Sequence, residues 1–467
     1  MQTSIPPDVP PSNSPSPEPT VTIKSDTGSD NVLVPRRRCG IVLPVSNYIL
    51  DGRRPPEVLF TPKHYSLPCS PGPITKVLQH ERRTFVAGSV AGGEVDDLDE
   101  LPVEHNGPGA LTFCFEKDFV NVYGHYRGSP IPKFYSVNDI ALYYPRIHSL
   151  PYLISSGNDY RVYVWHFEDR LKYEPRLSPP ADVYSHSTGV QPTKIAVKTN
   201  GFCFAVSSRQ VILNIETPEL TWFTKPLRLV HEATPARAGP ITWGSNSSDS
   251  ILFASSTGFY NPTYVGHHKA FDVDNEAESF TFALDEDGEQ IATNDDGDKL
   301  AIFSHLYPQN HIGGSSPQRL LRLYDIRRKD GRSPSSKVSL GHARTNCASF
   351  SRDGFYLAIG NANRHVIVHD VRMNRTLRDY VHVGTGRGIT HLEWRITRGY
   401  RLSLFTAGPD GSVRRWQPEG ALDQGLVVAN VGTHIAHFAM QNGPSEHDLV
   451  IAQSDGTVSF WDGYGEI

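Results

Sequence analysis

The chain has 467 residues, a net charge of −5 and a hydrophobic content of 38%. That length is enough for one large β domain or for about two or three ordinary domains. The small negative charge argues against a nucleic-acid-binding protein, which usually carries a basic excess. No apolar run approaches the ~18 residues of a membrane-spanning helix.

Residues 1–38 are rich in proline, serine, threonine and aspartate and contain no aromatic residue. Such a segment cannot offset its ordering entropy by burial, so we expect a disordered tail. It has no apolar segment of the signal-peptide kind. The five cysteines form no CxxC pair, and three of them lie in apolar runs. Free thiols and a cytoplasmic or nuclear location are therefore expected.

From residue 39 onward the chain consists of short alternating strands bounded by turn residues. The stretch from Gly341 to Asn374 is the clearest example. It predicts strands at Thr345–Phe350, Phe355–Ile359 and His365–His369, followed by a fourth at Arg378–Val383. Four antiparallel strands make a small sheet that buries neither face by itself, so the unit must be repeated.

The same order of strands and turns recurs along the chain. Good copies cover residues 137–166, 388–416 and 434–462, and weaker copies lie before and between them. The third strand of each unit ends near one of eight positions, namely Phe115, Trp165, Asn214, Phe271, Tyr324, His369, Trp416 and Trp461. Unrelated strands would not be spaced so evenly.

These units resemble WD40 repeats over residues 75 to 467. Gly341-His342 matches the Gly-His that precedes the first strand in that family, and Trp461-Asp462 is a true Trp-Asp pair. Degenerate or partial forms occur at Tyr324-Asp325, His369-Asp370, Trp165-His166 and Trp416-Gln417. Asp159, Asp410 and Asp455 fit the family's aspartate in the turn between the second and third strands.

The resemblance implies an all-β fold, a single WD40-like β-propeller over residues 39–467 with four-stranded blades. Our count of units favours eight blades. Seven is the commonest number in the family, and residues 271–326 can be divided in more than one way, so both numbers are kept. In this fold Trp165, Tyr324, Trp416 and Trp461 pack between blades and are expected to be buried.

The last unit stops at its third strand, close to the C-terminal Ile467. We therefore expect an N-terminal strand to complete the last blade and close the ring. The candidate segments are Gly40–Val45 and Glu57–Phe60.

No catalytic, cofactor-binding or metal-binding residues are predicted. The glycine-rich run Gly384–Gly388 precedes a strand and not a helix, so it is interpreted as a loop between blades. The acidic runs Asp285–Glu289 and Asp295–Asp298 lack the spacing of an EF-hand and are interpreted as acidic turns. His267 and His268 are adjacent, so joint ligation of a metal is not expected.

Two neighbouring units end in Asp-x-Arg, at Asp325 and Arg327 and at Asp370 and Arg372. In the WD40 family, a strand ending in Trp-Asp-x-Arg resembles the box with which substrate receptors of cullin-type ubiquitin ligases bind their adaptor. Neither copy here has the tryptophan. The structural interpretation is an ordinary local ion pair after a strand.

The leading functional hypothesis is a non-enzymatic protein–protein interaction scaffold that presents its loops to protein partners. The alternative is a ubiquitin-ligase substrate receptor that binds its adaptor through the two Asp-x-Arg boxes. An enzyme built on propeller loops is the third hypothesis. We expect protein partners, no nucleic acid and no membrane insertion.

Overall fold

A computed structural model describes residues 63–462 apart from gaps. The gaps are residues 69–72, 89–110, 116–117, 123–125, 128–132, 135, 145–150, 166–180, 185–191, 199–202, 217–221, 230–236, 258–267, 276, 283–285, 307–317, 328–332, 385, 387, 398–400, 420–424 and 444–445. The predicted disordered tail, residues 1–38, lies outside the described residues.

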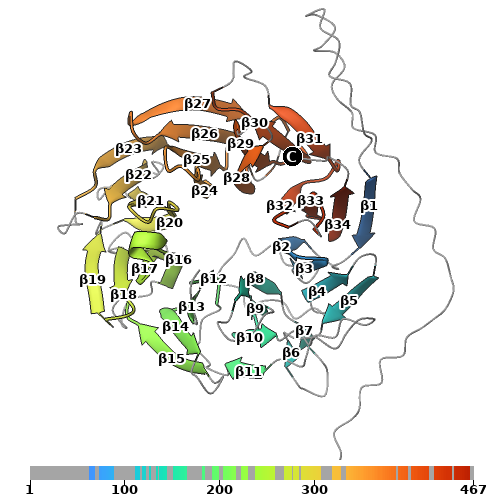
Figure 1. Ribbon diagram of the computed structural model, residues 1–467, viewed down its shortest axis with the longest axis horizontal. Coiled ribbons are helices and arrows are strands. Elements are labelled where there is room, and N and C mark those ends of the chain that lie inside the picture. The colour runs from blue at the N-terminus through green and yellow to red at the C-terminus, as the bar shows by residue number, and fades with distance from the viewer. Residues whose placement is uncertain are drawn as a thin grey trace, which may run out of the picture. The chain divides into compact units, whose positions relative to one another are not determined.

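The described chain forms eight four-stranded antiparallel sheets arranged around an axis, here called blades 1 to 8 (Figure 1). Blade 1 consists of β2 (Ile74–His80), β3 (Arg83–Gly88), β4 (Leu111–Phe115) and β5 (Asp118–Val122), and blade 2 of β8 (Val137–Tyr143), β9 (Tyr152–Gly157), β10 (Val162–Trp165) and β11 (Ala181–Tyr184). Blade 3 consists of β12 (Lys194–Val197), β13 (Cys203–Ser207), β14 (Val211–Glu216) and β15 (Trp222–Leu227), and blade 4 of β16 (Arg237–Trp243), β17 (Ile251–Thr257), β18 (His268–Asp272) and β19 (Ala277–Phe282).

Blades 5 to 8 follow the same plan, with the first strand innermost and the fourth outermost (Figure 1). Blade 5 consists of β20 (Asp287–Thr293), β21 (Lys299–Leu306), β22 (Gln318–Asp325) and β23 (Ser336–Gly341), and blade 6 of β24 (Thr345–Phe350), β25 (Tyr356–Asn361), β26 (His365–Asp370) and β27 (Arg375–Val381). Blade 7 consists of β28 (His391–Thr397), β29 (Arg401–Ala407), β30 (Ser412–Trp416) and β31 (Leu426–Asn430), and blade 8 of β32 (Ile435–Met440), β33 (Leu449–Gln453), β34 (Thr457–Asp462) and β1 (Lys63–Pro68).

Two short elements lie outside this plan. Strands β6 (Tyr126–Arg127) and β7 (Lys133–Phe134) pair with each other between blades 1 and 2 of the sequence, and the 3-10 helix η2 (Asn246–Ser248) joins β16 to β17. No helix in the described part of the chain is long and apolar enough to cross a membrane.

The predicted β-propeller is confirmed, and the number of blades is eight. All eight residues chosen from the sequence as the ends of third strands lie in third strands of separate blades. The ambiguous region is resolved because β19 completes blade 4 and β20 opens blade 5. In blade 6 the first strand matches its predicted bounds, whereas the fourth begins at Arg375, three residues before the predicted Arg378.

The hydrophobic core is divided among the junctions between blades. Each of the eight clusters of buried apolar side chains in the described residues combines residues from two adjacent blades. The four aromatic residues predicted to be buried are 1% to 2% exposed, and Trp416, for example, packs with Tyr356 and Leu404 across the junction of blades 6 and 7. A blade therefore buries its faces only against its neighbours.

The innermost strands close the ring. Each contacts the innermost strand of the next blade, from β2 through β8, β12, β16, β20, β24 and β28 to β32, which contacts β2 again. At every junction a side chain on one blade donates a hydrogen bond to a backbone carbonyl of its neighbour. These bonds join Thr75 to Val137, Asn138 to Pro192, Trp243 to Ala196, Thr293 to Trp243, Gln290 to Asn346, Asn346 to Ile389, Thr390 to Ile435 and Gln79 to Ala439.

The ring is completed by an N-terminal strand, as predicted, but by a different segment. Strand β1 pairs antiparallel with β34 over its full length, from Lys63 opposite Asp462 to Pro68 opposite Thr457. Tyr65 stacks on Phe460 with ring centroids 4.7 Å apart. The two candidate segments, residues 40–45 and 57–60, lie outside the described residues, and the position assigned to them is occupied by β1. Proline is tolerated there because β1 is an edge strand.

Deletions around β1 test this closure. We expect a chain lacking residues 1–62 to stay soluble and to unfold in one cooperative thermal transition, since β1 is retained. Deletion of residues 1–68 leaves the edge of β34 unpaired, so aggregation or loss of the cooperative transition is expected. Light scattering and differential scanning calorimetry measure both outcomes. A soluble, cooperatively folded chain starting at residue 69 would show that β1 is dispensable.

The aromatic side chains at the junctions are expected to contribute strongly to stability. Replacing Trp416 with alanine should lower the free energy of unfolding by ~3–5 kcal/mol, because the large ring leaves a cavity between two blades. The exposed Phe223, 56% exposed on an outermost strand, provides the matched control, for which Phe223→Ala should change little. Equal losses of stability in urea denaturation would contradict the packing argument.

Candidate interaction face

Neighbouring strands of a blade run in opposite directions. The turn between the first and second strands and the turn between the third and fourth strands therefore lie at the same end of the blade. We call this end the lower face, and the end with the turns between second and third strands the upper face. Both Asp-x-Arg pairs follow third strands, β22 and β26, and therefore lie on the lower face of blades 5 and 6. The turn between the first two strands of the same blade lies beside each pair.

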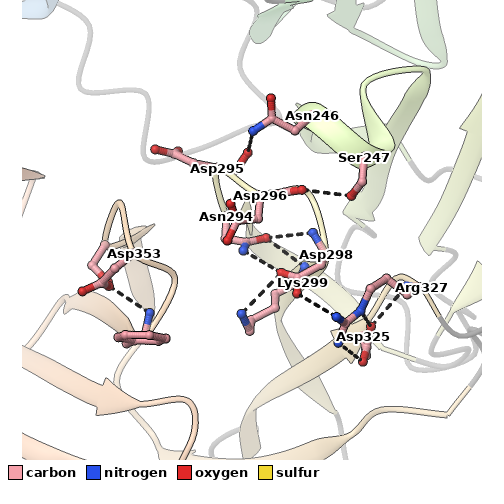
Figure 2. A network of polar contacts seen from close by, with 12 residues as sticks. Asn246, Ser247, Asn294, Asp295, Asp296, Asp298, Lys299, Asp325, Arg327 and Asp353 are labelled. Carbon is pink, nitrogen blue, oxygen red and sulfur yellow. Dashed lines mark hydrogen bonds and ion pairs between the residues drawn. The ribbon is translucent and has the colours of Figure 1, made fainter.

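The first turn of blade 5 is fixed by one asparagine (Figure 2). The Asn294 side chain accepts hydrogen bonds from the backbone N–H of Asp298 at 3.1 Å and of Lys299 at 2.8 Å, and it donates to the Asp298 carboxylate at 2.7 Å. Gly297 has a positive φ of 72°, and a Cβ there would lie 1.7 Å from the carbonyl oxygen of Ser245. The predicted turn at Asp295–Asp298 is thus confirmed.

The neighbouring blade holds this turn from the side (Figure 2). Asn246 donates through its side-chain amide to the backbone carbonyl of Asp295, and the Ser247 hydroxyl donates to that of Asp296 at 2.9 Å. Both contacts cross the junction between blades 4 and 5. They use backbone carbonyls, so the turn is anchored without using the carboxylates of Asp295 and Asp296.

The first Asp-x-Arg pair is a closed local ion pair (Figure 2). Arg327 donates to the two carboxylate oxygens of Asp325 at 2.9 Å and 2.8 Å, and its other terminal nitrogen lies 3.5 Å from Asp298. The side chain is nevertheless 66% exposed. This geometry matches the structural interpretation made from the sequence, because the donors of the guanidinium are turned toward carboxylates of its own blade.

The second pair is more open. The Asp370 carboxylate accepts the backbone N–H groups of Arg372 and Met373, each at 3.0 Å, whereas the Arg372 guanidinium is 3.6 Å away. Burial alone would raise the pKa of Asp370, but these N–H groups and the guanidinium lower it. The carboxylate is therefore largely used to fix the turn, and the Arg372 side chain remains 50% exposed.

Arg372 instead lies over an aromatic ring. Its guanidinium carbon is 4.1 Å from the centroid of Phe355, a cation–π contact. Phe355 is 40% exposed and Met373 is 59% exposed, so both apolar side chains reach the lower surface of blade 6. Arg352, in the adjoining turn, is exposed as well. We call Arg352, Phe355, Arg372 and Met373 the blade 6 patch.

Three members of this patch, Arg352, Phe355 and Met373, were not identified as site residues from the sequence. Phe355 was predicted to start the second strand, but β25 begins at Tyr356. The reason is the turn before it, in which Asp353 accepts the N–H of Phe355 at 3.0 Å and the Ser351 hydroxyl accepts that of Tyr356 at 2.9 Å. This turn directs Phe355 outward. Met373 could have been found from the sequence, because it directly follows the Asp-x-Arg pair of blade 6.

The upper face contains a hydrogen-bonded chain in blade 7. Trp416 donates to the Thr406 hydroxyl at 2.7 Å, that hydroxyl lies 2.8 Å from Nε2 of His382, and Nδ1 of His382 lies 3.1 Å from Asp410. Burial lowers the pKa of His382, although Asp410 opposes this effect, so the ring is neutral. Its one proton is assigned to Nδ1 because that nitrogen faces the carboxylate of Asp410. The chain fastens the loop before β28 to the turn of blade 7.

Asp410 of this hydrogen-bonded chain was predicted from the sequence, whereas Thr406 and His382, which join it to Trp416, were not. No Gly-His pair marks His382, because a valine precedes it. The small residue Gly408 makes room for it, since a Cβ there would lie 2.3 Å from Nδ1 of His382. Asp159, in the corresponding turn of blade 2, accepts hydrogen bonds from the backbone N–H of Arg161 at 3.2 Å and from the Tyr163 hydroxyl at 3.3 Å.

One predicted acidic turn is wrong. The run at Asp285–Glu289 is a strand from Asp287 onward, and Glu286 and Glu289 are 3% and 9% exposed. Arg322 pairs with Glu286, and Arg319 donates to Glu289 at 2.7 Å. Burial would raise the pKa of Glu286, but the hydrogen bonds from Arg322 and Ser304 hold it below its usual range. Paired arginines from β22 explain how this acidic segment can be buried.

The glycine-rich run and the histidine pair were the other segments considered from the sequence. Gly384–Gly388 joins β27 to β28, as predicted for a loop between blades. His268 is fully buried in β18, while His267 lies outside the described part. Within that part, no group of three or more histidine, cysteine or acidic side chains could hold a metal ion.

Solved structures share this fold. The Dos1 propeller superposes with a TM-score of 0.63 at 16% identity, covering 86% of this chain and 94% of its own. Sqt1 of Chaetomium thermophilum, bound to the N-terminus of the ribosomal protein L10, gives a TM-score of 0.60 at 14% identity and covers 85% of this chain and 98% of its own. Sqt1 without that segment gives 0.58 at 14% identity, covering 85% and 97%.

These similarities confirm the β-propeller as the fold. No protein-family model matches the sequence, and a search of curated proteins finds no match either.

The hydrogen-bonded chain in blade 7 predicts a specific acid sensitivity. Burial would raise the pKa of Asp410, but His382 and Ser412 lower it to about 2, below the usual ~3.9 of an unfolded aspartate. The ionised carboxylate therefore stabilises the fold above pH ~4, and this contribution is lost as the pH falls from ~4 to ~2. Asp410→Asn should be less stable than the wild type at pH 6, and the difference should shrink over that window. A difference independent of pH in urea denaturation would contradict this role.

Proposed function

We propose that this chain is a non-enzymatic scaffold that binds protein partners through the lower face of its propeller. The observation that carries the proposal is the blade 6 patch, in which an arginine, an aromatic ring and a methionine are exposed side by side. Arginine, aromatic residues and methionine are enriched in protein–protein interfaces. Arginine and the large aromatics tyrosine and tryptophan are also enriched among interface hot spots.

The geometry of the patch suits a protein contact. Asp353 and Asp370 accept backbone N–H groups of their own turns, so the carboxylates beside the patch are already engaged. Arg352 and Arg372 are both exposed on the same blade. A partner segment that combines an acidic residue with an apolar side chain would match both features. Sqt1, which has the same fold, binds the N-terminus of a ribosomal protein, and this supports a protein ligand as the class.

The second candidate function is a substrate receptor of a cullin-type ubiquitin ligase. What favours it is that Arg327 and Arg372 are both exposed on the lower face of adjacent blades. Adaptor binding through both boxes would require Arg327 to leave its bidentate contact with Asp325. The receptor function therefore predicts that adaptor binding depends on Arg327, whereas partner binding through the blade 6 patch does not require Arg327.

The cell compartment is also proposed and follows from cysteine chemistry. Cys114, Cys203 and Cys347 are free thiols, and burial raises the pKa of Cys203 and Cys347 to about 12. Free thiols suit the reducing cytoplasm or nucleus.

Partner capture with matched variants tests the proposal. The tagged full-length chain is incubated with lysate of cells that naturally express it, and bound proteins are quantified by mass spectrometry. A specific partner should be lost with the double variant Arg372→Ala/Met373→Ser. It should be retained with Val383→Ser, a control whose valine is 69% exposed in the loop between β27 and β28. Thermal melting of each variant verifies that the fold is intact.

The same experiment separates the two functions. Loss of a ubiquitin-ligase adaptor with Arg327→Ala alone would favour the receptor function. Partners lost only with the patch variant would favour a general scaffold. A set of partners unchanged by both variants would refute the lower face as the binding surface.

A further inference from the structure

A row of polar side chains crosses blade 5 at its upper end. Asp287, the first residue of β20, is opposite His305 near the end of β21, and His305 is opposite Arg319 near the start of β22. Arg319 is in turn opposite Gly341, the last residue of β23. The row therefore extends from the innermost to the outermost strand and ends at the loop that leads into blade 6.

A β-bulge brings a second carboxylate to the middle of this row. The pairing of β20 with β21 shifts in register at Glu289, which has no partner on β21. The Glu289 carboxylate lies 3.3 Å from Nδ1 of His305 and accepts a hydrogen bond from Nε of Arg319 at 2.7 Å. The Asp287 carboxylate lies 3.5 Å from Nε2 of His305. Each nitrogen of this imidazole thus faces a carboxylate.

These contacts favour the protonated form of His305. Only the imidazolium ion carries an N–H on both nitrogens, so only this form can donate to both carboxylates. The side chains of His305, Asp287 and Glu289 are 16%, 10% and 4% exposed, so water competes little for the contacts. Burial by itself would lower the pKa of His305, but the contacts with Asp287 and Glu289 raise it above its ordinary value.

The other ionisable groups around His305 are paired or neutral. Strand β21 lies between β20 and β22, and Arg322 of β22 pairs with Glu286, the residue before β20. On the adjacent blade 4, burial lowers the pKa of His268 to about 4, although Glu286 and Asp287 oppose this effect. The imidazole of His268 is therefore neutral at pH 7. Within this group, His305 is the residue whose charge changes near neutral pH.

The same network holds the loop between blades 5 and 6, residues 342–344. The second oxygen of the Glu289 carboxylate accepts the backbone N–H of Thr345 at 2.9 Å, at the start of β24. At the other end of the loop, the Arg319 guanidinium donates to the backbone carbonyl of His342. Both ends of this short loop are thus attached to side chains of the network.

We propose that His305 is a proton-controlled clasp for the loop of residues 342–344 at the upper face. While His305 is protonated, it bridges Asp287 and Glu289 and keeps the Glu289 carboxylate in place to accept the N–H of Thr345. When the proton is lost, one imidazole nitrogen presents a lone pair to a carboxylate, so that this contact becomes repulsive. Glu289 is then held less firmly, and the loop gains freedom to move.

The clasp controls a surface that is separate from the blade 6 patch. His342 and Arg344 are exposed at the upper face, whereas the patch is formed by turns of the lower face. A partner that contacts these two side chains would meet an ordered loop in mildly acidic or neutral conditions and a loosened loop in alkaline conditions. Failure of the clasp therefore leaves partner binding through the lower face unaffected.

Hydrogen exchange of the full-length chain tests the clasp. Folding raises the pKa of His305, so its contribution is complete below ~6.5, the usual value of an unfolded histidine, and is lost as the pH rises through the folded value. After correction for the intrinsic exchange rate, the amide protection of Thr345 should fall at least about tenfold between pH ~6 and pH ~9, because its hydrogen bond to a charged group is weakened. In His305→Gln, whose side chain does not titrate, the protection should change little. Constant protection in the wild type would overturn the clasp.

Urea denaturation gives a second readout with a matched control. The stability lost in His305→Gln should be largest near pH ~6 and should shrink as the pH rises above ~6.5. The control is His365→Gln, since His365 lies 2.8 Å from Asp379 but is 39% exposed, and exposed ion pairs contribute little. An equal pH dependence in the two variants would contradict a role specific to the buried histidine.

Asp287→Asn tests the same contact without removing the histidine. This variant lacks one of the two carboxylates that favour the protonated ring. The pH at which the amide of Thr345 loses its protection should therefore move downward, toward ~6.5. An unchanged midpoint would show that Asp287 does not hold the proton on His305, and it would refute the bridging contact.

Discussion

The structure depends on one constraint, which is that a four-stranded sheet cannot bury both of its faces by itself. Every apolar cluster in the described residues is shared by two adjacent blades, so each blade is stabilised only through its neighbours. The side-chain hydrogen bonds that cross each junction add directional contacts to this packing. The ring has no free end once β1 pairs with β34, and a closed ring removes the edges at which sheets aggregate.

Buried and exposed charged residues have different roles in this ring. Glu286 is one of the buried charged residues, and it pairs with Arg322 of its own blade. The turns of the lower face use their aspartates to bind backbone N–H groups, which leaves arginine side chains at the surface.

The two Asp-x-Arg pairs show how similar motifs acquire different properties. Asp325 and Asp298 together hold Arg327, because the first turn of blade 5 brings a second carboxylate close. Blade 6 has no such carboxylate at the same place; its Asp353 caps the turn and directs Phe355 outward. Arg372 consequently lies over an aromatic ring. The motif alone does not distinguish these outcomes, since the difference comes from the adjoining turn.

The sequence by itself determined the repeated four-stranded unit, the all-β propeller, the buried third-strand aromatics and the need for an N-terminal strand, because alternation and turn residues are local properties. It did not select β1 as the closing strand. It placed Glu286 and Glu289 in a turn because their arginine partners lie 36 and 30 residues further along the chain. The blade 6 patch and the hydrogen-bonded chain from Trp416 to Asp410 were decided only by the tertiary structure. Each joins side chains from separate turns, strands or blades, and these meet only when the blades fold and the ring closes.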